Sequence, residues 1–219
     1  MFDWAYTFEI LPLLAKAAVV TIEATLLGFV LAAILGLGFA LLRMAPSALI
    51  SGATATVVEF IRSTPLLIQI YLLYFVVLPA IGIAPTAFTA GVFALGIHYA
   101  TYCSEVYRAG LEGIPRGQWE ASIALNLSSY HTFRDVILPQ AIPPVVPALG
   151  NYLVALFKET PLLAAISALE LMYVAKRLGS ETFRYTEPMT LVGLFFLAMS
   201  LVSAGLIRFV EYRLNERHR

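Results

Sequence analysis

Two stretches of the chain place charged side chains beside a proline within an otherwise apolar sequence. Residues 62–67 read Arg-Ser-Thr-Pro-Leu-Leu, residues 158–163 read Lys-Glu-Thr-Pro-Leu-Leu, and the windows around them align without gaps. Proline kinks a helix, and at membrane depth the freed backbone groups must face protein or a water-filled cavity. Transporters build substrate sites at such breaks. The candidate substrate-pathway residues are therefore Glu59, Arg62, Thr64, Pro65, Lys158, Glu159, Thr160 and Pro161.

These charges also permit a structural interpretation. Arg62 and Lys158 could extend toward a lipid interface, or pair with Glu59 and Glu159 to hold helices together. Charged side chains inside a membrane are costly and usually functional. Both interpretations therefore stay open, and a substrate with opposite charges would suit the same residues.

The longest polar interval, about residues 112–139, is typical of two short helices with a bend between them. Asn126 tolerates the left-handed conformation that ends many helices. Ser128 or Ser129 can cap the second helix, and Pro139 is expected to end it. The interval therefore predicts a compact helix–turn–helix that projects from the remainder of the chain.

The composition places this hairpin on a membrane protein. Of the 219 residues, 60% are hydrophobic and 13% are charged, whereas globular domains are about 45–50% apolar and about 25% charged. We expect an all-α, polytopic membrane protein with a single transmembrane domain, 1–219. The 14 basic and 14 acidic residues balance, which argues against nucleic acid as a partner.

A spanning helix needs about 20 mostly apolar residues, and the sequence predicts about five of them. They cover approximately 16–42, 56–79, 87–107, 141–165 and 188–209. A less apolar helical segment, 167–184, precedes the last span, with Gly179 as its expected C-cap, and a charged tail, about 210–219, ends the chain. Small residues at every fourth position of the first span predict close helix packing: Gly28, Ala32, Gly36 and Ala40.

Loop charges predict the orientation. Five spans put the two termini on opposite sides of the membrane, and the side with the hairpin and the C-terminus carries more Lys and Arg. The positive-inside rule therefore predicts an extracytoplasmic N-terminus, with the hairpin and the C-terminus in the cytoplasm.

The motifs of several enzyme classes are absent from the sequence. It contains no Gly-x-x-x-x-Gly-Lys-Ser/Thr phosphate loop, no His-Glu-x-x-His and no Gly-x-Ser-x-Gly. Cys103 is the single cysteine, so neither an internal disulfide nor a cysteine-rich metal site is available. We expect neither catalysis nor a cofactor or metal in this chain.

The hairpin resembles the EAA loop of bacterial ABC importer permeases, whose pattern is Glu-Ala-Ala, three residues, Gly, nine residues and Ile-x-Leu-Pro. Residues 120–122 read Glu-Ala-Ser, Asn126 stands in the glycine position, and residues 136–139 read Val-Ile-Leu-Pro. Three residues depart from this pattern but keep its physical character. Ser122 is small like the second alanine, Asn126 tolerates a left-handed backbone like glycine, and Val136 is β-branched like isoleucine. The resemblance implies a cytoplasmic ATPase-coupling loop that uses Gly117, Glu120, Ala121, Ser122, Asn126, Leu138 and Pro139.

Further motifs extend the resemblance to the polar amino acid branch of type I ABC importer permeases. They are Arg-Ser-Thr-Pro-Leu-Leu at 62–67, Tyr-Arg-Ala-Gly-Leu at 107–111, Ile-Pro-x-Gly-Gln-x-Glu-Ala at 114–121 and Leu-Pro-Gln-Ala at 138–141. Glu170-Leu171 and residues 179–185 look most like ectoine and hydroxyectoine permeases. The resemblance implies an importer for a polar amino acid or an ectoine-type zwitterion.

The family implies several partners in a bacterial inner membrane. They are a second permease subunit (identical or homologous), cytoplasmic subunits that bind ATP and Mg, an extracytoplasmic substrate-binding protein and the membrane lipid. The alternative is an ion-gradient-driven secondary transporter or channel assembled from several copies. It would use the same broken helices and would leave the hairpin without a role.

Overall fold

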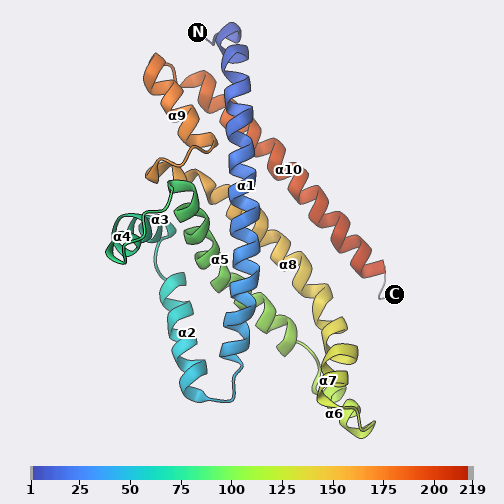
Figure 1. Ribbon diagram of the computed structural model, residues 1–219. Helices are drawn as coiled ribbons and strands as arrows, with labels where there is room; N and C mark the ends of the chain where they lie inside the picture. The colour runs from blue at the N-terminus through green and yellow to red at the C-terminus, as the bar shows by residue number, and fades with distance from the viewer. Residues whose placement is uncertain (1, 217–219) are drawn as a thin grey trace.

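The computed structural model describes residues 2–216, which form helices and short connections and contain no strand. In chain order the α-helices are α1 (Trp4–Arg43), α2 (Ala48–Arg62), α3 (Leu66–Tyr71), α4 (Leu78–Ala80), α5 (Ala87–Glu112), α6 (Arg116–Ala124), α7 (Ser129–His131), α8 (Leu138–Glu159), α9 (Leu171–Thr182) and α10 (Thr186–Glu216). By length and composition, three helical segments could cross a membrane: Trp4–Arg43, Ser129–Ile166 and Thr186–Arg213. The bent pair described below would be a fourth. Helix α5 is also long and packs among them (Figure 1).

Helix α1 runs along the molecule, and α2, α5, α8, α9 and α10 all pack against it (Figure 1). Its small-residue stripe is buried, as the sequence predicts. A Cβ atom on Gly36 would lie 2.6 Å from the Cys103 Cβ and 2.8 Å from the Ala100 carbonyl oxygen. The glycine therefore lets α1 and α5 approach to backbone contact.

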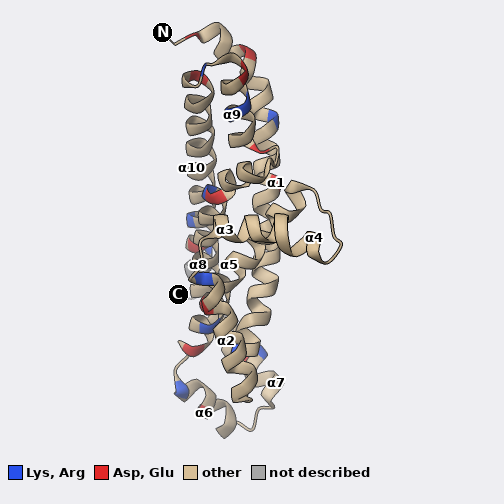
Figure 2. Ribbon diagram, turned by 90° about the vertical axis from the view of Figure 1, so that its left-hand side faces the viewer, with Lys and Arg blue, Asp and Glu red and all other residues tan. Residues whose placement is uncertain are grey.

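The predicted second span is a broken helix, and Pro65 lies at the break as the sequence predicts. Helix α2 and the segment Leu66–Ala80 meet at 103°, and α3 and α4 project sideways from the bundle (Figure 2). Pro65 has an extended backbone at the break. Proline also disfavours the α conformation in the residue before it, here Thr64, and it cannot donate a helical hydrogen bond.

Two π-helical segments, Leu72–Val77 and Thr132–Ile137, each come just before a helical proline, Pro79 or Pro139. The expectation that Pro139 ends its helix was therefore wrong: the helix continues into α8. In a π turn each N–H bonds the carbonyl five residues back. We attribute the tolerance of the proline to this wider turn, because it relieves the clash with the carbonyl four residues back.

Helix α9 and the start of α10 form a second core with the first half of α1, at the end of the molecule where the N-terminus lies (Figure 1). Gly179 lies inside α9 and does not cap it; Phe183 is the C-cap. The glycine is needed for packing, because a Cβ there would lie 2.5 Å from the Tyr185 ring.

The last helix continues through most of the expected charged tail, to Glu216, and residues 217–219 lie outside the described part of the chain. The hairpin of α6 and α7 lies at the end of the molecule opposite the N-terminus (Figures 1 and 2). The orientation of these ends relative to the membrane stays a prediction.

Candidate functional site

Three tyrosines form a cluster between α5 and α8. The ring centroids of Tyr99 and Tyr102 are 5.8 Å apart, those of Tyr102 and Tyr152 are 5.5 Å apart, and those of Tyr99 and Tyr152 are 6.3 Å apart. The His98 ring lies 5.3 Å from Tyr102. Aromatic faces attract cations, so this tyrosine cluster (Tyr99, Tyr102 and Tyr152) can bind a positively charged group.

Opposite charges from the two proline breaks reach this tyrosine cluster. The Arg62 guanidinium carbon lies 5.2 Å from the centre of the Tyr102 ring, and the Glu159 carboxylate interacts with the Tyr99 side chain. Arg62 Nε and Glu159 Oε2 are buried and have no hydrogen-bond partner among residues 2–216. Buried polar atoms of native proteins are usually satisfied, so these two atoms mark a place where hydrogen-bonding capacity is left unused.

The two proline breaks pack against each other. Helix α3 contacts the 3₁₀ segment Thr160–Ile166, and Leu66 and Leu163 belong to the same buried cluster. The hydroxyl groups of Thr64 and Thr160 both donate to carbonyl oxygens of the preceding turn. Because Thr160 is fully buried and bonded to its own helix, its hydroxyl stabilises the break locally.

Glu59 and Lys158 lie apart from the tyrosine cluster. Glu59 is exposed, with its carboxylate 3.9 Å from Arg62 Nη1. Lys158 is exposed at a groove of about 490 Å³ between α8 and α10, which Arg208 and Glu211 also line. The expected pairing of Lys158 with Glu159 does not appear among the ion pairs of the described residues, whereas Arg62 does pair with Glu59.

Glu105 links Arg62 to two further arginines. Its carboxylate accepts hydrogen bonds from arginines on three helices: Arg43 of α1, Arg62 of α2 and Arg108 of α5. Three guanidinium groups around one carboxylate hold the ends of these helices together. Sequence reasoning missed the contacts with Arg43 and Arg62, because only the i,i+3 pair with Arg108 is visible as a spacing.

Gln69 and His98 connect the first break to α5. Gln69 Nε2 donates to the carbonyl oxygens of Ile61 (2.6 Å) and Thr64 (3.0 Å), and Gln69 Oε1 lies 3.0 Å from His98 Nδ1. Because an amide oxygen only accepts, His98 must donate from Nδ1. The bend next to Arg62 is therefore fixed by a chain of hydrogen bonds through two side chains.

Replacing His98 with leucine should leave Gln69 Oε1 unsatisfied and should lower the free energy of unfolding by about 1–3 kcal/mol. His98→Asn should lose less, because the asparagine amide nitrogen can take the place of Nδ1. Thermal unfolding of the purified protein in detergent compares the two variants. Equal losses would contradict a specific role for the Nδ1 donor.

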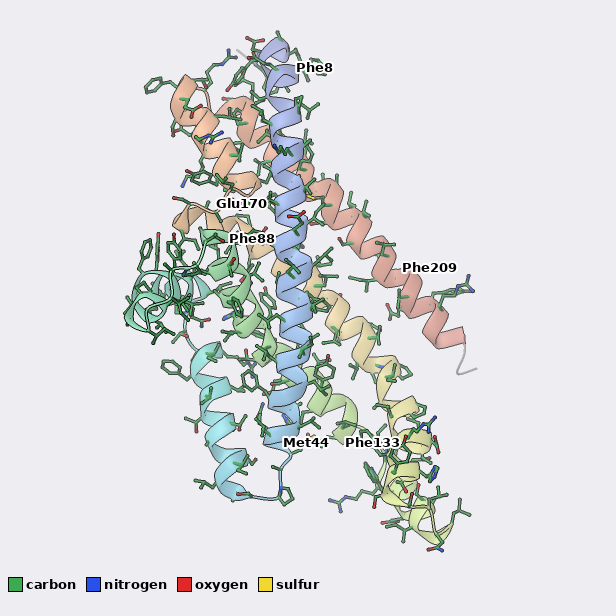
Figure 3. The ribbon with its side chains drawn as sticks, in the orientation of Figure 1. Phe8, Met44, Phe88, Phe133, Glu170 and Phe209 are labelled. Carbon is green, nitrogen blue, oxygen red and sulfur yellow. The ribbon has the colours of Figure 1, made fainter. Side chains whose placement is uncertain are left out.

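Apart from its continuation through Pro139, the hairpin has the bend and the cap that the sequence predicts. Asn126 has a φ of 54°, and the Ser128 hydroxyl caps α7 by accepting from the backbone N–H of His131. Ser122 is the buried residue of α6, and its hydroxyl donates to the Gln118 carbonyl oxygen. Phe133 marks the second arm of the hairpin in Figure 3.

The exposed face of α6 combines apolar and acidic residues. Glu120 is exposed and lies three residues before Ile123, which is 75% exposed; Leu125 is 73% exposed. Ala121 and Gly117 are also exposed, and no atom lies within 4 Å of a Cβ built on Gly117. A helix with this exposed apolar surface at the tip of a molecule is a candidate protein-binding surface.

A second buried carboxylate lies where α9 begins. Glu170 is fully buried beside α1 (Figure 3) and accepts from the backbone N–H groups of Met172 (2.9 Å) and Tyr173 (2.7 Å). Burial raises the pKa of this carboxyl to about 7. Sequence reasoning gave Glu170 no structural role, although an acidic residue before a helix is a capping signal.

The chain is similar in sequence to known membrane transport proteins. Residues 28–216 match the model of the family called binding-protein-dependent transport system inner membrane component. A Sinorhizobium fredii protein described as a probable amino-acid ABC transporter permease is 44% identical over 98% of this chain and 93% of its own. The arginine transport system permease protein ArtQ of Bacillus subtilis is 29% identical over 97% of both chains.

Two solved structures of ABC transporters contain chains with the same fold as this one. A chain from the crystal structure of an amino acid ABC transporter with histidines superposes with a TM-score of 0.90 at 33% identity, over 97% of this chain and 99% of that one. A chain of the MetNI methionine ABC transporter shares the fold, with a TM-score of 0.80 at 20% identity over 94% of this chain and 98% of its own. The matches therefore extend over nearly the whole length of the chain.

Proposed function

The chain belongs to the family of binding-protein-dependent transport system inner membrane components, as a permease of the polar amino acid branch of type I ABC importers, and we propose that it imports a zwitterion at the tyrosine cluster. The observation that carries this proposal is the pair of buried, unsatisfied polar atoms, Arg62 Nε and Glu159 Oε2. The substrate is a polar amino acid or an ectoine-type compatible solute.

The opposite charges define how such a substrate would lie. Its carboxylate accepts from Arg62, which is held by Glu105 and is a planar donor suited to carboxylates. Its cationic group faces Glu159 and the tyrosine rings. The negative charge of Glu159 and the π faces of the rings both attract a cation. Thr64, Pro65, Thr160 and Pro161 shape this pathway by breaking the two helices.

The hairpin couples this pathway to ATP hydrolysis. Cytoplasmic subunits that hold ATP and Mg bind α6, and the contact includes Glu120 and its apolar neighbours. Leu138 and Pro139 continue the second arm into α8, and α8 ends at Glu159. A displacement of the hairpin is thus transmitted along one helix to the substrate pathway.

The assembly contains a second permease subunit, identical or homologous, and an extracytoplasmic substrate-binding protein. It lies in a bacterial inner membrane with the N-terminus outside and the C-terminus in the cytoplasm. The positive-inside distribution of Lys and Arg supports this orientation.

Reconstitution in liposomes with the partner ATPase and binding protein tests the proposal. Uptake of radiolabelled polar amino acids and ectoine should require ATP. Glu159→Gln should raise the KM of uptake about tenfold, because it removes a charge partner of the substrate cation. Glu9→Gln is the matched control, an exposed carboxylate on α1.

Two results would contradict the proposal. Uptake that needs an ion gradient and ignores ATP would favour the secondary transporter. An unchanged KM in Glu159→Gln would show that Glu159 does not contact the substrate. That result would not contradict ATP-driven import.

A further inference from the structure

Arg62 uses only one end of its guanidinium group to bind the rest of the chain. Its Nη1 donates to Glu105 Oε1 at 3.2 Å and lies 3.9 Å from Glu59 Oε2. Neither Nε nor Nη2 of Arg62 has a hydrogen-bond partner among residues 2–216. These two atoms carry parallel N–H groups, which can bind both oxygens of one carboxylate. The edge of Arg62 that suits a carboxylate is therefore unused.

Arg108 binds the same glutamate and uses its whole guanidinium group. Its Nε and Nη2 donate to Glu105 Oε2 at 3.2 Å and 2.8 Å. Its Nη1 donates to both oxygens of Glu112, at 2.8 Å and 2.6 Å. All three nitrogens of Arg108 thus have partners within the protein, whereas Arg62 keeps two of its three nitrogens free. The two arginines therefore differ in role although they share one carboxylate.

Glu105 is itself held in place on both sides. Its Oε2 accepts from Arg108, and its Oε1 accepts from Arg43 as well as from Arg62. Because two other arginines hold this carboxylate, it is a fixed acceptor for Nη1 of Arg62. The backbone next to Arg62 is also fixed, through the hydrogen bond from Gln69 to the Ile61 carbonyl oxygen. The position of the guanidinium group is therefore set before any substrate binds.

The guanidinium group lies beside the tyrosine cluster. Its central carbon is 5.2 Å from the centre of the Tyr102 ring. The Arg62 side chain is 33% exposed, although its Nε is buried. A buried donor without a partner costs free energy, and a carboxylate bound at this edge would recover that cost.

A purely structural role for Glu105 explains less of this arrangement. It accounts for the joining of α1, α2 and α5, but it gives no reason for a buried and unpaired Nε. An arginine that served only to join α2 to α5 could present its Nε and Nη2 to Glu105, as Arg108 does. The contact through Nη1 alone keeps the other edge free.

We propose that Glu105 is a positioning residue that makes this importer selective for substrates with a carboxylate. Glu105 holds Nη1 of Arg62 and so keeps the edge formed by Nε and Nη2 free beside the tyrosine cluster. When the pathway opens, the substrate carboxylate binds this edge with both oxygens, and Glu105 does not contact the substrate. This inference rests on the proposed function, and it adds the residue that orients Arg62 and the substrate group that this orientation selects.

The test compares two inhibitors of uptake by the complete importer in liposomes. One is the compound that the ATP-dependent uptake assay identifies as substrate, and the other is the same compound with its carboxylate converted to a carboxamide. The unmodified importer should bind the carboxylate form at least about tenfold more tightly, because a neutral carboxamide has one acceptor oxygen in place of two charged ones. This preference measures the contribution of the carboxylate site.

Glu105→Gln should raise the inhibition constant of the carboxylate form about tenfold and leave that of the carboxamide unchanged. Inhibition constants do not depend on how much of the variant folds, so a loss of folded protein does not obscure the result. Glu112→Gln is the matched control, because this carboxylate lies on the same helix and pairs with Arg108. It should change neither inhibition constant.

Two results would overturn the inference while the proposed function stands. Glu105→Gln could leave both constants unchanged, or it could raise them equally, in which case Glu105 only holds the helices together. An unmodified importer that does not distinguish the carboxylate from the carboxamide would mean that the substrate carboxylate does not bind Arg62. The proposed mode of substrate binding would then fail together with the inference.

Discussion

Replacing Gly36 with leucine should prevent α1 and α5 from packing at their native separation. A Cβ at this position would already lie 2.8 Å from the Ala100 carbonyl oxygen and 3.2 Å from the Ser104 backbone nitrogen. Backbone atoms inside a helix cannot turn aside as a flexible side chain can. Overpacked cores lose about 1–3 kcal/mol and occasionally more; we expect a loss at or above the upper end of this range.

Gly38 provides the matched control, because it lies on the same helix and a Cβ there would meet nothing within 4 Å. Gly38→Leu should be neutral or stabilising, since leucine favours a helix over glycine by up to about 1 kcal/mol. Thermal unfolding of the two purified variants in detergent measures the difference. A Gly36→Leu protein as stable as Gly38→Leu would show that the close approach of α1 and α5 does not exist in solution.

Replacing Glu120 with alanine should uncouple transport from ATP hydrolysis. Glu120 and Ile123 are exposed one helical turn apart on α6, and the proposed ATPase contact would bury both. Truncating one partner of a charge pair in an interface costs about 2–5 kcal/mol, and 2 kcal/mol corresponds to roughly thirtyfold. We therefore expect substrate transported per ATP to fall by roughly thirtyfold or more.

Asp135→Ala is the control for this experiment. Asp135 is an exposed carboxylate on the second arm of the hairpin, and its neighbours His131 and Arg134 belong to that same arm. Uptake and ATP hydrolysis are measured on the same reconstituted complexes, after co-purification has shown that the subunits remain assembled. Normal coupling in Glu120→Ala, or equal losses in both variants, would exclude a specific role for Glu120.

Several features of this fold were predictable because one residue type imposes them locally. Proline cannot donate a helical hydrogen bond, so the breaks at Pro65 and Pro161 follow from composition. Asparagine tolerates a positive φ, and Asn126 adopts one. The stripe that includes Gly36 marks a close helix contact because only small side chains let backbones approach.

Two other local signals led to wrong expectations, for different physical reasons. Pro139 does not end its helix, because a π turn precedes it. Gly179 does not cap α9: it makes room for the Tyr185 ring, and Phe183 takes the left-handed position instead. At Gly179 the local preference is weaker than the packing of the Tyr185 ring, whereas at Pro139 the wider turn before the proline removes the reason for the helix to end.

The sequence by itself determined the membrane class, the helical content, the two broken helices and the hairpin, because each depends on residues close together in the chain. Only the tertiary structure decided which charges meet. Arg62 lies 43 positions before Glu105, and no spacing rule predicts their hydrogen bond. Likewise, Arg184 reaches Asp3 across 181 positions only because α9 and α10 fold back onto α1. An ion pair needs its partners within a few ångströms, and for distant residues that separation is set by how the helices pack.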